Sequence, residues 1–123
     1  MVSKILQYVI VRKDILPTKK SSQAFTMGAC MAQACHAVTA AIVRNLSARE
    51  TQQYIEGLED MTVCVLGVDT ADELLSVSSQ LAEHRIPYHL WIEKPEKIPT
   101  ALATAPMEKD TVAPLVAHLK LLR

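Results

Sequence analysis

The stretch that decides the fold class of this chain is Leu6-Gln7-Tyr8-Val9-Ile10-Val11. It is a short run of residues that favour β-strands, and the polar residues at 12–14 end it, as is typical of a buried strand. A second apolar run, residues 61–68, has Gly67 near its end and predicts another buried strand. Together the two runs indicate a sheet with strands in its interior.

A long Ala- and Met-rich segment without proline, about residues 23–44, lies between the two predicted strands and predicts a helix. Apolar residues cover most of its circumference, so we expect burial on several sides, with Met27 and Met31 in the core. The preceding residues 16–22 are rich in polar residues and predict a loop.

Two capping-box patterns, Ser47-x-x-Glu50 and Thr70-x-x-Glu73, predict further helices that end near residues 57 and 84. Residues 88–92 predict a short strand, residues 93–99 a charged loop and residues 100–105 a final edge strand. Pro114 belongs in a first helical turn, so we expect the last helix over about residues 110–119.

The predicted order is β-α-α-β-α-β-β-α in a single α/β domain over residues 1–123. Two βαβ-like units joined in this order imply a mixed, mostly parallel four-stranded sheet. Helices on both faces of that sheet would give a three-layer α/β/α arrangement.

The overall charge of the 123 residues is zero, which argues against a strong non-specific binder of nucleic acid. The charge is unevenly placed, because residues 1–44 carry six basic side chains and one acidic side chain. A basic end is compatible with a phosphate backbone and equally with a solvated surface, so both interpretations stay open.

Three cysteines with no even disulfide framework and no CxxC spacing indicate reduced, buried thiols and an intracellular protein. No run approaches the roughly 18 uninterrupted apolar residues of a membrane span, so we expect no membrane partner. The spacing of His, Cys and carboxylate residues does not resemble a metal site.

The polar residues of the long helix are its most informative feature. At about 100° per residue, Thr26, Ala29, Gln33 and His36 project within one sector of roughly 80°. A glutamine offers donors and an acceptor, and a histidine can donate or accept. Such a pair is either a satisfied core pair or part of a site, and its residue types alone favour the core.

The chain resembles the type 2 peptidyl-tRNA hydrolase family, and most closely the branch called peptidyl-tRNA hydrolase domain-containing proteins. The resemblance covers nearly the whole chain. Its central motif is Gly28 followed by Ala32-Gln33-x-x-His36-Ala37. The other matching segments are residues 7–14, 69–74, 91–93, Thr100 and 118–121.

This resemblance implies hydrolysis of the ester between a peptide and the 3′ ribose of tRNA, in the cytoplasm and without a cofactor. It implies a catalytic group of Gln33, His36, Glu93 and Thr100, and it is compatible with a homodimer. Physically, such a site must orient water, stabilise an oxyanion and hold a phosphate-rich stem. The basic residues available for phosphate contacts are Arg12, Lys13, Lys19 and Lys20.

Two departures from the family pattern favour an alternative. The slot that the family usually fills with lysine is Ala29, and the loop from Glu93 to Thr100 lacks the usual Gly-Arg-Thr-like stretch. Losing a cation beside Gln33 and His36 removes a partner for an oxyanion or a phosphate. The alternative is therefore a catalytically impaired homologue that acts as a tRNA- or protein-binding module.

Overall fold

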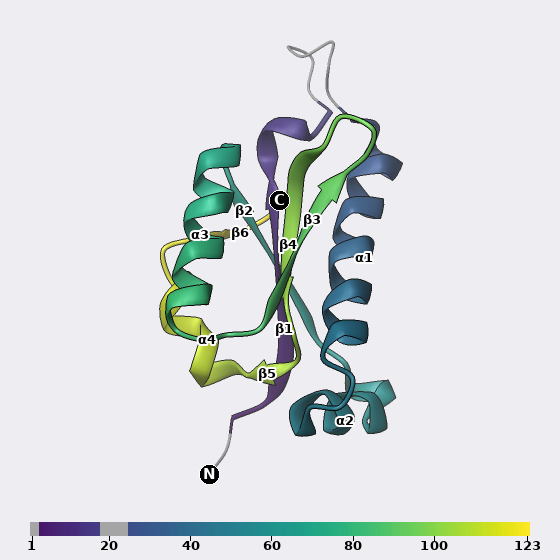
Figure 1. Ribbon diagram of the computed structural model, residues 1–123, viewed down its shortest axis with the longest axis vertical. Coiled ribbons are helices and arrows are strands. Elements are labelled where there is room, and N and C mark those ends of the chain that lie inside the picture. The colour runs from purple at the N-terminus through teal and green to yellow at the C-terminus, as the bar shows by residue number, and fades with distance from the viewer. Residues whose placement is uncertain (1–2, 18–24) are drawn as a thin grey trace.

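A computed structural model describes residues 3–17 and 25–123 (Figure 1). Most of the predicted loop over residues 16–22, and the first residues of the predicted long helix, lie outside the described residues. The helices are α1 (Met27–Arg44), α2 (Arg49–Glu56), α3 (Ala71–Glu83) and α4 (Lys109–Val116), with 3-10 turns η1 (Lys13–Ile15) and η2 (Leu58–Asp60). The strands are β1 (Ile5–Arg12), β2 (Val63–Val68), β3 (Tyr88–Glu93), β4 (Ile98–Thr104), β5 (Met107–Glu108) and β6 (Lys120–Leu121).

The sheet is mixed and has six strands, in the order β3-β4-β1-β2-β6 with β5 paired to β1. The prediction of a four-stranded, mostly parallel sheet was wrong, because only β1 and β2 run parallel and the other four pairings are antiparallel. Strand β4 was also misplaced: it lies between β3 and β1, and β3 forms the edge. A tight connection between β3 and β4 makes a hairpin, which is antiparallel by necessity.

The first strand separates two hydrophobic clusters, because its side chains point alternately to the two faces of the sheet. Leu6, Tyr8 and Ile10 belong to a cluster with residues of α3 and α4. Val9 and Val11 belong to a second cluster with α1 and β4. Figure 1 shows the same division, with α1 on one side of the sheet and α3 and α4 on the other.

Helix α1 begins at Met27 because Thr26 caps it, its hydroxyl accepting a hydrogen bond from the Ala29 N–H at 3.1 Å. Its buried residues, Cys30, Gln33, Ala37 and Ala41, form one stripe facing the sheet. The expectation of burial on several sides was wrong, since Met27 and Met31 are 55% and 63% exposed. The small alanines of this stripe allow the helix to approach the sheet closely.

The caps of the two following helices differ. Thr70 caps α3, its hydroxyl accepting from the Glu73 N–H, while the Glu73 carboxylate accepts from the Asp69 N–H. Helix α2 starts at Arg49 without a side-chain cap, so the predicted capping box at Ser47 was wrong. Its end at Gly57 is confirmed.

The last helix is shorter than predicted. It runs from Lys109 to Val116, and Pro114 is its sixth residue, so the expectation that Pro114 lies in the first turn was wrong. Residues 120–121 then form β6. None of the described helices is long and apolar enough to cross a membrane.

The three thiols do not share one environment. Cys30 is buried, Cys64 is half-buried and Cys35 is exposed, and all three are free. The expectation that all are buried was therefore wrong for Cys35, which lies on the outer face of α1.

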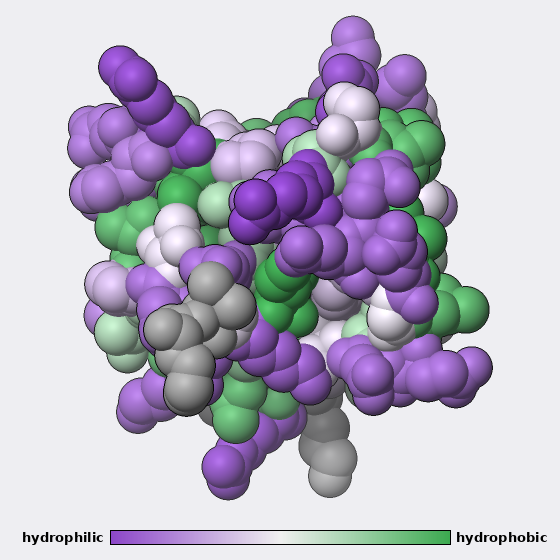
Figure 2. All heavy atoms as spheres, turned by 90° about the horizontal axis from the view of Figure 1, so that it is seen from below, coloured by the Kyte–Doolittle hydropathy of each residue, from purple (hydrophilic) through white to green (hydrophobic). Residues whose placement is uncertain are grey.

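The two ends of the sheet differ in what they carry. Figure 1 shows the start of α1 beside the β3–β4 hairpin at one end, and α2 and β5 at the other. Figure 2 views the α2 and β5 end, where hydrophilic side chains cover much of the surface and hydrophobic areas lie between them. The residues with candidate chemistry gather at the hairpin end.

Candidate active site

The side-chain amide of Gln33 joins α1 to both strands of the hairpin. Its Nε2 donates to Glu93 Oε2 at 2.7 Å and to the Ala29 carbonyl at 3.1 Å, and its Oε1 accepts from Thr100 Oγ1 at 2.8 Å. A carboxylate can only accept, so the amide nitrogen must face Glu93 and the oxygen is left for Thr100. Gln33 is 1% exposed and every polar atom of its side chain is bonded.

Thr100 reaches Gln33 because the hairpin is irregular at this residue. Trp91 pairs with Ala101 and Ile92 pairs with Pro99, so Thr100 is an extra residue on β4. Regular alternation would point Thr100 to the same face as Leu102, away from α1. A bulge re-aims a side chain in this way, and it brings the fully buried Thr100 hydroxyl to the α1 side.

Glu93 is the half-buried carboxylate at the end of β3. The hydrogen bond from Gln33 is the largest cause that lowers its pKa below the ordinary value for glutamate. Partial burial opposes this effect, and smaller contributions from Trp91, the Lys94 N–H and the charge of His36 add to it. The Glu93 carboxylate is therefore ionised at neutral pH.

His36 is linked to the same carboxylate through Trp91 and lies on the exposed side of α1. Its ring stacks on Trp91, with centroids 4.4 Å apart and ring planes at 20°. The Trp91 Nε1–H donates to Glu93 Oε1 at 3.3 Å, so the two carboxylate oxygens have different donors. The structure thus brings together all four residues of the predicted catalytic group.

The sequence interpretation missed Trp91 as a member of this site. The signal was its spacing from Glu93, because residues i and i+2 on a strand point to the same face. Its stacking on His36 depends on how α1 crosses the sheet, and no sequence spacing shows that.

The four predicted phosphate contacts divide into three groups. Arg12 is committed to its own chain: its guanidinium donates twice to Asp14, at 2.9 and 2.8 Å, and once to the Pro99 carbonyl at 3.0 Å. With a side chain only 16% exposed, Arg12 holds η1 and β4 in place. Lys19 and Lys20 lie outside the described residues.

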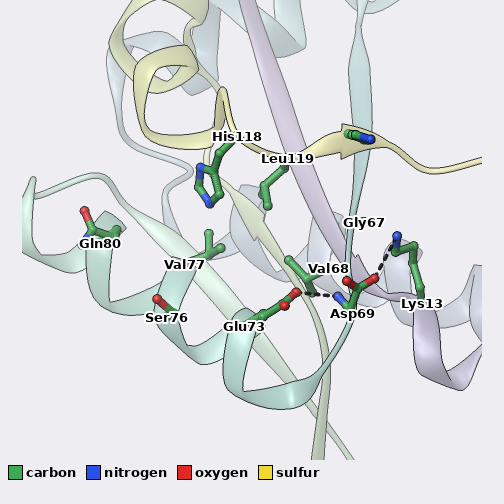
Figure 3. A pocket seen from close by; sticks show the side chains of 11 residues that line it. Lys13, Gly67, Val68, Asp69, Glu73, Ser76, Val77, Gln80, His118 and Leu119 are labelled. Carbon is green, nitrogen blue, oxygen red and sulfur yellow. Dashed lines mark hydrogen bonds and ion pairs between the residues drawn. The ribbon is translucent and has the colours of Figure 1, made fainter.

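Lys13 lies at β2, across β1 from the two strands that Gln33 contacts. Its Nζ lies 2.9 Å from Asp69 Oδ1, and both side chains are well exposed. Figure 3 shows this pair at the rim of a cavity of about 440 Å³, formed mainly by β2, α3 and residues 118–120. Gly67 makes room for Lys13, since a Cβ there would lie 2.9 Å from the Lys13 Cγ and Cδ.

Within the described part of the chain, no group of three or more His, Cys, Asp or Glu side chains is arranged to hold a metal ion. An ionised carboxylate, a nearby imidazole and a buried amide that aligns the carboxylate can orient and polarise a water molecule.

The helices and the mixed sheet define the class as an α/β protein, with the Glu93 carboxylate held at the end of an edge strand. More particularly, the chain belongs to the peptidyl-tRNA hydrolase PTH2 family, whose model matches residues 5–122. A human and a mouse relative, each described as "Putative peptidyl-tRNA hydrolase PTRHD1", are both 31% identical to it over 119 residues. The match covers 97% of this chain and 83% of each relative.

Proposed function

We propose that this chain hydrolyses the ester bond of peptidyl-tRNA, with Glu93 as the group that orients and deprotonates water. The observation that carries the proposal is the chain of hydrogen bonds from Thr100 through Gln33 to Glu93. All polar atoms of the buried Gln33 amide are hydrogen-bonded, so the amide cannot turn. It therefore holds the Glu93 carboxylate in one orientation. Membership of the family supports the substrate class.

In the proposed reaction, Glu93 accepts a hydrogen bond from a water molecule. The water oxygen attacks the ester carbonyl carbon while one of its protons moves to the carboxylate. The bond to the 3′ ribose oxygen then breaks, and the proton passes to that oxygen. The products are a tRNA with a free 3′ hydroxyl and a peptide with a new carboxylic acid, which releases its proton to solvent.

In this scheme, His36 stabilises the negative charge that develops on the oxygens of the ester during the reaction. Its exposed ring lies over Trp91, next to the carboxylate, where an N–H can donate to the carbonyl oxygen or to the leaving oxygen. The family usually has a lysine at the position of Ala29, and this chain lacks that cation. His36 is therefore the group available to stabilise the charge.

We further propose that Lys13, Lys19 and Lys20 contact the phosphates of the tRNA. The Lys13–Asp69 pair is exposed, and exposed ion pairs contribute little, so Lys13 can exchange Asp69 for a phosphate at small cost. Arg12 does not fit this role, since its donors hold Asp14 and Pro99.

The wider proposal is a single domain that acts in the cytoplasm, where peptidyl-tRNA arises. A homodimer is proposed from the family resemblance alone. Sedimentation equilibrium would separate a monomer from a dimer directly.

Release of free tRNA from N-acetyl-aminoacyl-tRNA tests the function. We expect the wild-type chain to turn over, and the variant Ala29→Lys to turn over at least as fast, because it restores a cation beside Gln33. An inactive wild type together with an active Ala29→Lys would contradict the proposal and favour the binding module. Inactivity of both would remove hydrolysis from the alternatives.

A pH titration tests the electrostatics of the site. The carboxyl carbon of Glu93, followed by NMR, should titrate below the ordinary glutamate value of about 4.3. Because the native pKa is the lower one, this contact stabilises the fold above the unfolded-state pKa. That stabilisation is lost as the pH falls through the native pKa.

In the variant Gln33→Met the pKa of Glu93 should rise, because the hydrogen bond from Gln33, the largest cause that lowers this pKa, is gone. An unchanged titration would contradict the role of Gln33.

A further inference from the structure

Strand β3 is an edge strand that ends at the candidate catalytic carboxylate. Among the described residues it pairs only with β4, so its second edge carries main-chain N–H and C=O groups without a strand partner. Figure 1 shows β3 in front of β4, with its arrowhead at the hairpin. Glu93 is the last residue of the strand. An unpaired edge of this kind is a template for another extended chain.

The first hydrogen bond of the hairpin shows which main-chain groups of β3 face β4 and which face its open edge. The Ala105 N–H donates to the Pro87 carbonyl at 2.9 Å, which makes this opposed pair a hydrogen-bonded one. Inward and outward groups alternate along an antiparallel strand. Hence His89 and Trp91 direct their main chain to β4, while Leu90 and Ile92 direct theirs to the open edge.

A groove follows the open part of this strand. It has a volume of about 380 Å³ and is lined by six consecutive residues, His89, Leu90, Trp91, Ile92, Glu93 and Lys94. The lining is mostly apolar along the strand and becomes charged at Glu93 and Lys94. Its charged end is therefore continuous with the site of the proposed chemistry.

We propose that the peptide part of the substrate adds to the open edge of β3 as an extended strand. The inference rests on the proposed function and extends it to a peptide subsite. With its ester carbonyl at Glu93, the peptide would run parallel to β3, its earlier residues lying beside Ile92 and Leu90. Hydrogen bonds from the main chain recognise any peptide sequence, which suits an enzyme whose substrates differ in every side chain.

The length of the strand sets the reach of this subsite. At roughly 3.3 Å per residue, the Leu90 position lies about 10 Å from Glu93 along the strand. A single N-acetylated amino acid cannot reach it, whereas a tetrapeptide can. Chain length alone therefore separates the chemical site from the subsite.

The test compares N-acetyl-aminoacyl-tRNA with a tetrapeptidyl-tRNA that ends in the same amino acid. We expect kcat/KM of the wild type to be about tenfold higher for the long substrate, the effect of two added main-chain hydrogen bonds. Methylation of the peptide nitrogens, one at a time, should reduce kcat/KM at alternate positions, because only alternate residues of a strand bond to one neighbour.

A matched pair of variants tests the strand itself. Leu90→Pro removes the outward N–H, a change that edge strands tolerate, and Leu90→Ala removes the side chain alone. Relative to Leu90→Ala, the proline variant should lose about five- to tenfold in kcat/KM on the tetrapeptidyl substrate and less than twofold on the short one. The methylated substrates need only the wild type, so they decide the question even if the proline variant does not fold.

The outcomes separate the subsite from the function. Equal kcat/KM for both lengths, or an N-methyl series without alternation, would overturn the subsite and leave hydrolysis standing. Absence of hydrolysis of both substrates would overturn the proposed function, and the subsite with it.

Discussion

Replacing Glu93 with glutamine is expected to lower kcat/KM for N-acetyl-aminoacyl-tRNA by about 10²–10⁴, the usual contribution of a positioned base. The amide has nearly the same shape and can still accept from Gln33 Nε2, so the fold should persist. What disappears is the negative charge that takes the proton from water. Initial rates of tRNA release, with circular dichroism as the check on folding, measure the effect.

Glu96→Gln is the matched control, because Glu96 is exposed and lies on the same hairpin. Its kcat/KM should stay within about twofold of the wild type, as expected for a screened surface charge. A Glu93→Gln variant with more than a third of wild-type activity would contradict the assignment of Glu93 as the base. His36 would then be the next group to test, since its ring is adjacent.

Replacing Gln33 with alanine is expected to lower the free energy of unfolding by about 2–4 kcal/mol. The change leaves a void at a site that is 1% exposed. It also strips the fully buried Thr100 hydroxyl of its acceptor and frees Glu93 from its strongest donor. Urea denaturation, analysed with a common slope, gives the difference.

A double-mutant cycle with Thr100→Val identifies the cause. Once Gln33 is alanine, the threonine hydroxyl has lost its partner, so Thr100→Val should cost less in that background than in the wild type. His36→Ala is the comparison on the same helix and should cost under about 1 kcal/mol, because His36 is exposed. Additive effects of the two buried changes would show that the hydrogen bond contributes little.

The two experiments probe different properties of one hydrogen-bonded group. Glu93→Gln keeps the geometry and removes the charge, whereas Gln33→Ala keeps the charge and removes the geometry. If the site works as proposed, both variants lose activity, but only Gln33→Ala loses much stability. A loss of stability in both would indicate that the group serves mainly the core.

Several features could be predicted from the sequence because short-range chemistry decides them. The strand at residues 6–11 and the helix capped by Thr70 were confirmed, since β-branched runs and capping residues act on their own neighbours. The membership of Gln33, Glu93 and Thr100 in one site came from the family resemblance. Their direct hydrogen bonds now give it a physical basis.

Other features could not be predicted, because they depend on which surfaces meet. The apolar residues of α1 suggested burial all round, yet Met31 faces outward, since the sheet covers only one side of the helix. The sheet was expected to be mostly parallel because the β-α-β order at the start was extended to the end of the chain. The hairpin and the short strands β5 and β6 reverse that direction.

By itself, the sequence determined that this protein has a mixed α/β fold and that Gln33 and His36 project within one sector of a helix, because periodicity and capping are local. Only the tertiary structure decided that β4 lies inside the sheet and that a bulge turns Thr100 toward Gln33. It also decided that Arg12 bonds to Asp14 and Pro99 instead of remaining free for a phosphate. These outcomes depend on strand register and on contacts such as the one between Arg12 and Pro99, which lie 87 positions apart, and no local pattern encodes them.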